Sequence, residues 1–93
     1  MDAFDRIAAR TPEYITREVE KNLAIAVRII SILKAQGKTK YDLARLLEKP
    51  ESEVSRWLTG SYNLDLKIIY KIETVLNAHI IFVAEDIPLS IAA

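Results

Sequence analysis

Apolar residues recur at spacings of three and four along most of this chain, a period that predicts helices. The pattern covers three stretches, residues 12–36, 39–60 and 65–77. The first predicts one long helix, with Thr11 as a capping residue, Pro12 in its first turn and Gly37 just beyond its end.

The long helix presents two apolar stripes, separated by about 100 degrees around its axis. One stripe contains Val19, Leu23, Ala26, Val27, Ile30 and Leu33, and the other contains Ile25, Ile29 and Ile32. One stripe can pack on the rest of the chain, and we expect the second, Ile25, Ile29 and Ile32, to contact another copy. Alternatively, residues 1–11 form an N-terminal arm or short helix that folds back and covers it.

Residues 39–60 predict two short helices that meet at a corner. Thr39 can cap the first helix, with Asp42 three residues later reaching back to it. Pro50 ends the first helix and is well placed to open the second, which Gly60 closes. Because both helices are short and the connection is tight, we expect them to cross steeply.

The last third of the chain predicts a helix capped by Asp65 and ended by Asn77, followed by a strand over residues 79–84. The run HIIFVA is branched and aromatic, as strands are, although it could also extend the preceding helix. Since no second strand is evident, this one should pair with another copy across a twofold axis or with a different protein, and we favour the dimer. The dimer interface would then include Ile80, Ile81, Phe82 and Val83.

These elements predict one all-α domain over residues 1–93, a compact bundle of four to five helices with a short C-terminal strand and an irregular tail at 85–93. The absence of cysteine and the single histidine exclude disulfides, thiolate chemistry and the common zinc sites. No spacing resembles a catalytic constellation or a phosphate-binding loop. We therefore expect a protein without enzymatic activity or cofactor.

The chain begins with a polar segment and contains no apolar run of about 18 residues, so neither a secretory signal nor a membrane span is predicted. A cytoplasmic location follows as the expectation. Formal net charge is +0, but residues 34–71 hold eight basic and five acidic side chains, whereas residues 72–93 hold three acidic side chains and no basic one. The positive excess coincides with the predicted helix pair.

Residues 20–77 resemble the helix-turn-helix of the phage-repressor and Cro type, the xenobiotic-response-element family of bacterial regulators. The resemblance rests on Ala44 in the first short helix, Val54 in the second, and the ending SRWLTG. Two positions depart from the family pattern. Glu48 stands where the family has glycine at the corner, and Pro50 stands where it has a capping serine or threonine.

The resemblance implies that the exposed face of the second short helix touches base edges in double-stranded DNA, with Arg56 suited to guanine and Glu51 to a cytosine amino group. Serine hydroxyls on this face can donate or accept. Lys38, Thr39 and Lys40 at the preceding helix start are expected to bind phosphate. The implied DNA-binding set is Lys38, Thr39, Lys40, Glu51, Ser52, Ser55, Arg56, Ser61, Tyr62 and Asn63.

Three functions are compatible with this sequence. The first is a homodimeric repressor that places two helices in successive major grooves about 34 Å apart and binds an inverted repeat. The second is an antitoxin resembling the HigA-like proteins, which would neutralise a basic protein toxin and repress its own operon. The third is an interaction module that keeps the fold but has lost DNA binding.

Overall fold

The computed structural model describes residues 11–84, which form four α-helices. They are α2 (Glu13–Ala35), α3 (Lys40–Leu47), α4 (Glu51–Trp57) and α5 (Leu66–Leu76). The arm or helix expected before residue 11 and the irregular tail expected at 85–93 lie outside the described residues. The N-cap of α2 is Pro12, one residue after the predicted Thr11, and Pro12 supplies no side-chain cap hydrogen bond.

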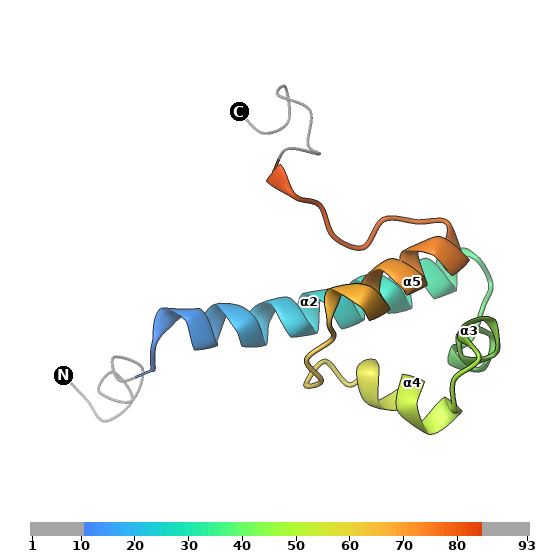
Figure 1. The fold of residues 1–93 in the computed structure, drawn as a ribbon, viewed down its shortest axis with the longest axis horizontal. Helices are drawn as coiled ribbons and strands as arrows, with labels where there is room; N and C mark the ends of the chain where they lie inside the picture. The colour runs from blue at the N-terminus through green and yellow to red at the C-terminus, as the bar shows by residue number, and fades with distance from the viewer. Residues whose placement is uncertain (1–10, 85–93) are drawn as a thin grey trace.

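The long α2 is the axis of the molecule, and α5 lies along its C-terminal half (Figure 1). α3 and α4 lie together beside this pair, and Figure 1 views α3 almost along its axis and α4 from the side, so the two cross steeply. The N-terminal half of α2 extends beyond the other three helices. None of the helices within residues 11–84 is long and apolar enough to cross a membrane.

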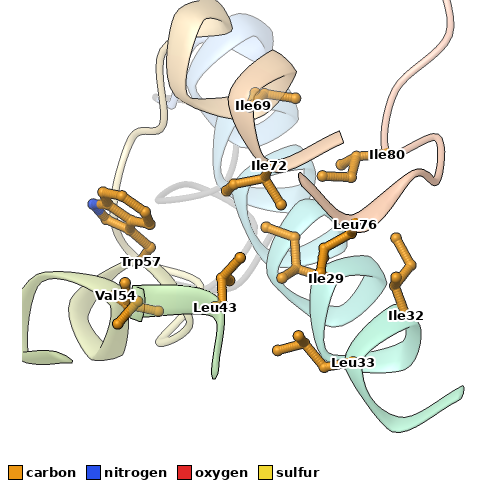
Figure 2. Close-up of a cluster of buried hydrophobic side chains, with 11 residues drawn as sticks. Ile29, Ile32, Leu33, Leu43, Val54, Trp57, Ile69, Ile72, Leu76 and Ile80 are labelled. Carbon is orange, nitrogen blue, oxygen red and sulfur yellow. The ribbon is translucent and has the colours of Figure 1, made fainter. Parts of the chain in front are cut away.

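The core forms where all four helices meet, and Figure 2 shows its side chains converging from each of them. Its fully buried members are Ile29, Leu43, Val54, Trp57, Ile72 and Leu76. Ile29 and Ile32 therefore fill the chain's own core rather than the predicted interface with a second copy, and Ile25 is half-buried against the same cluster. Of the other predicted stripe, Ala26 and Leu33 are buried as well, whereas Val19, Leu23, Val27 and Ile30 stay exposed.

The segment after α5 does not form the strand predicted over residues 79–84, and no strand occurs within the described part of the chain. A carboxylate of α5 explains the difference. Glu73 Oε2 accepts hydrogen bonds from the backbone amides of Ile80 at 2.8 Å and Ile81 at 3.1 Å. The amides that a partner strand would have bound are thus satisfied inside the chain.

The same segment is held by its side chains. Ile80 is buried in the core and Ile81 is half-buried against it, whereas Phe82 and Val83 are exposed. Arg28 Nε in α2 donates to the carbonyl oxygen of His79 at 2.9 Å. Residues 79–81 therefore belong to the fold of one chain, which removes the predicted pairing of strands as a reason for a dimer.

Three helices end in the same way, with a left-handed residue followed by an amide that bonds back to the last turn. The left-handed residues are Gly37 (φ 65) after α2, Glu48 (φ 55) after α3 and Asn77 (φ 48) after α5. Lys49 N donates to the carbonyl oxygen of Ala44 at 2.9 Å and completes this motif at the corner. The family's corner geometry is kept, at a cost of roughly 1–2 kcal/mol for a residue with a Cβ.

Candidate nucleic-acid interface

The start of α3 is built by a complete capping box between Thr39 and Asp42, as the sequence predicts. Thr39 Oγ1 accepts from the Asp42 amide at 3.3 Å, and Asp42 Oδ2 accepts from the Thr39 amide at 2.8 Å. Arg45 Nη2 donates to Asp42 Oδ1 at 2.8 Å, the one ion pair found among residues 11–84. The Thr39 amide and hydroxyl are therefore engaged within the helix start rather than free for a phosphate.

Hydrogen bonds from the Thr39 backbone and hydroxyl lower the pKa of Asp42 below its ordinary value of 3.8, with smaller contributions from the charges of Arg45 and Lys38. A carboxyl group whose pKa is lowered by folding stabilises the folded protein when the pH is above the pKa of the unfolded state. This contribution is lost as the pH falls through the pKa of the folded state. Asp42→Asn should therefore be less stable than the wild type at neutral pH, with a difference that shrinks below about pH 4.

Urea unfolding of both proteins over a pH series measures this difference. Glu20→Gln is the matched control, since it removes an exposed carboxylate of α2 for which the structure shows no hydrogen bond, and its unfolding free energy should follow the wild type. A constant gap between wild type and Asp42→Asn down to pH 2 would contradict the assignment.

The outward face of α4 carries four of the predicted base-contacting residues together. Glu51, Ser52 and Arg56 are exposed and Ser55 is half-buried, while Val54 and Trp57 turn inward to the core. Pro50 occupies the N-cap of α4 and supplies no side-chain cap hydrogen bond. Arg56 forms no ion pair within the described residues, so its guanidinium remains available to an external acceptor.

The predicted phosphate-contacting residues lie at both sides of α4 but differ in how free they are. Lys38 is half-buried and its Nζ donates to Gln36 Oε1 at 2.8 Å. Lys40 Nζ lies 5.4 Å from the centre of the Tyr41 ring, within reach of a cation–π contact. Only part of the predicted set is therefore presented without an existing partner.

The turn after α4 holds the other predicted backbone contacts. Ser61 and Asn63 are exposed, and the Ser61 amide is bound by Thr59 Oγ1 at 3.2 Å. Tyr62 is half-buried against the core, so much of its ring serves packing. The turn is positioned beside the end of α4 by Thr59, whose hydroxyl also donates to the carbonyl oxygen of Arg56 at 2.8 Å.

Sequence reasoning did not single out a second group of cations, Lys49, Lys67 and Lys71. These three side chains line one hollow of about 220 Å³ between the corner, α4 and the start of α5, together with Trp57 and Asp65. They come from the corner and from α5, so their separation in sequence conceals their proximity. The positive excess of residues 34–71 was the only signal that could have found them.

Comparison with known families decides what this arrangement is. The sequence matches the helix-turn-helix family of the Cro/C1 type over residues 29–83, more than half of the chain. The chain belongs to this family. No curated protein and no solved structure shows significant similarity to it.

Because the chain belongs to this family, α3 and α4 are its helix-turn-helix pair. The family match also supports a function as a DNA-binding regulator of transcription. The matched region begins inside α2 at residue 29 and includes the segment that follows α5. The N-terminal half of α2 lies outside it. The projecting part of this helix is thus an addition to the helix-turn-helix, and its role has to be argued from its own surface.

Proposed function

We propose that this helix-turn-helix protein is a sequence-specific repressor that reads double-stranded DNA with the outward face of α4. The observation that carries the proposal is the unpaired guanidinium of Arg56 on an exposed helix face, flanked by the hydroxyls of Ser52 and Ser55. Arginine in this setting can donate two hydrogen bonds to guanine, the most common specific contact in a major groove. Glu51 on the same face supplies an acceptor for cytosine.

Arg56→Ala should weaken binding to the cognate site by about 5- to 150-fold, the range expected when one bidentate base contact is lost. The measurement is a gel shift with the region upstream of the protein's own gene, over a salt series. Arg17→Ala is the matched control, since it removes the same charge from the exposed N-terminal half of α2. Absent binding, or equal loss in both variants, would contradict base readout by Arg56.

A repressor of this kind binds an inverted repeat as a homodimer, and the described chain offers one surface suited to pairing. We call this surface the α2 stripe. It consists of five apolar residues that share one side of α2 and are each at least 38% exposed: Ile15, Val19, Leu23, Val27 and Ile30. It begins in the N-terminal half of α2 and continues past the middle of the helix. A face this apolar is normally covered, and pairing of two copies would replace the interface that the core residues cannot form.

Replacing Val19 and Val27 together by glutamate should convert a dimer into a monomer, because it places charges in the middle of the α2 stripe. Both residues are more than half exposed, and glutamate favours helix more than valine does, so the fold should persist. Sedimentation at micromolar concentration is the measurement. Lys21→Glu, on the exposed opposite side of α2, is the control that should remain dimeric.

The same stripe favours the antitoxin as a second candidate function, with a protein toxin in place of the second copy. A wild-type protein that sediments as a monomer would remove the dimer from the proposal. A neighbouring gene for a small basic ribonuclease-like protein, whose product binds the wild type but not the variant with glutamate at positions 19 and 27, would then support the antitoxin.

A further inference from the structure

The indole nitrogen of Trp57 is an unsatisfied donor at the edge of the core. Trp57 is 1% exposed, and its Nε1 has no hydrogen-bond partner among residues 11–84. Buried donors are nearly always bonded, so an orphaned one points to a missing acceptor. Figure 2 shows this nitrogen on the edge of the ring that faces away from Leu43 and Ile72.

The hollow that Trp57 lines is rich in positive charge. Lys49, Lys67 and Lys71 surround it, and none of the three forms an ion pair within the part of the chain that the structure describes. Asp65 also borders the hollow, but its Oδ1 already accepts from the Ile68 amide at 2.8 Å as the cap of α5. Three lysines and one aspartate therefore border the hollow, which leaves a formal excess of two positive charges.

We propose that this hollow is a binding site for a phosphate group, with Trp57 Nε1 donating to one oxygen and the three lysines balancing the charge. A phosphate has several acceptor oxygens, so it can satisfy a neutral donor and ammonium groups together. Lysines act here as point charges, which suits an ion that approaches from solvent. The first turn of α5 adds the positive end of its dipole beside Lys67.

Two sources could supply the phosphate. Lys49 directly precedes Pro50 and the start of α4, so a duplex seated on the outward face of α4 would carry its backbone close to the hollow. This source rests on the proposed DNA-binding function. Free phosphate, or the phosphate of a small metabolite, would use the same contacts and does not depend on that function.

Trp57 is the chain's single tryptophan, so its indole signal in a ¹H–¹⁵N spectrum reports this site alone. The full-length protein is titrated with inorganic phosphate at constant ionic strength, with sodium chloride as the balancing salt. We expect a saturable downfield shift of the indole proton. Lys67→Gln should weaken the apparent affinity for phosphate by about two- to fivefold. The double variant that combines Lys67→Gln and Lys71→Gln should weaken it more than either single substitution does.

Lys34→Gln is the matched control, because it removes an exposed lysine from the last turn of α2 and should leave the titration unchanged. An indole signal that does not move with phosphate, or that moves equally in Lys67→Gln and wild type, overturns the site. An equal response to acetate or chloride also overturns it, since that is screening rather than phosphate recognition. Unfolding curves of each variant verify that the fold is retained.

A short duplex forms the second arm of the experiment. A shift of the indole signal with DNA that is reduced in Lys67→Gln assigns the phosphate to the nucleic-acid backbone. A response to inorganic phosphate without a response to a duplex that binds in the gel shift assigns the site to a free phosphate. If no duplex binds at all, the proposed function fails while the phosphate titration still decides the site.

Discussion

Leu43→Ala should lower the free energy of unfolding by about 2–5 kcal/mol, the usual cost of truncating a buried leucine. Leu43 is 0% exposed and lies where α3 meets the other three helices, so its loss leaves a cavity bordered by Ile29, Val54 and Ile72. In a domain of this size, that loss should lower the Tm by roughly 10 °C or more. Thermal and urea unfolding provide the measurement.

Leu46→Ala is the control on the same helix. Leu46 is 46% exposed, so the same truncation removes little buried surface and should cost less than about 1 kcal/mol. Equal losses in the two variants would mean that α3 does not pack through Leu43 as described. The comparison thus tests the orientation of α3, on which the position of α4 depends.

Gly60→Ala should lower stability by about 2 kcal/mol, for two separate reasons. Gly60 has φ 84, a conformation that alanine rarely adopts. An added Cβ would also lie 2.8 Å from Leu23 Cδ1, so the end of this side chain would have to shift, whereas 3.4 Å from Leu23 Cα is an ordinary contact distance.

Gly37→Ala separates the two causes. Gly37 also has a positive φ, 65, but an added Cβ there meets nothing within 4 Å. It should therefore lose only the backbone contribution, about 1 kcal/mol. If unfolding measurements gave the same loss for both glycines, the contact between Gly60 and Leu23 would not contribute to stability.

Local signals in the sequence predicted the helices and their ends. The cap of α3 by Thr39, the cap of α5 by Asp65 and the end of α5 at Asn77 are all confirmed. Each depends on side chains and backbone atoms within a few residues of one another, so their physics is contained in short stretches of chain. The cap of α2 was the exception, because Pro12 and not Thr11 takes the N-cap position.

The candidate site was predictable only in outline. The face of α4 followed from helical periodicity, which separates Arg56 from Val54 and Trp57. The hollow lined by the three lysines did not follow from periodicity, because Lys49 and Lys71 are brought together only by the packing of α5 against the corner. The unsatisfied indole nitrogen of Trp57 likewise exists only once the core has closed around the ring.

The amino-acid sequence determined which segments are helical, where they start and stop, and that a helix-turn-helix lies in the middle of the chain. Tertiary structure decided which apolar residues of α2 are buried. Ala26 and Leu33 from one predicted stripe and Ile29 and Ile32 from the other are all buried. Val19 and Leu23 stay exposed, because the N-terminal half of α2 extends beyond the other three helices. It also decided the fate of residues 79–84. Their composition favours a strand. However, Glu73 accepts hydrogen bonds from the amides of Ile80 and Ile81, so these amides are not available to a neighbouring strand.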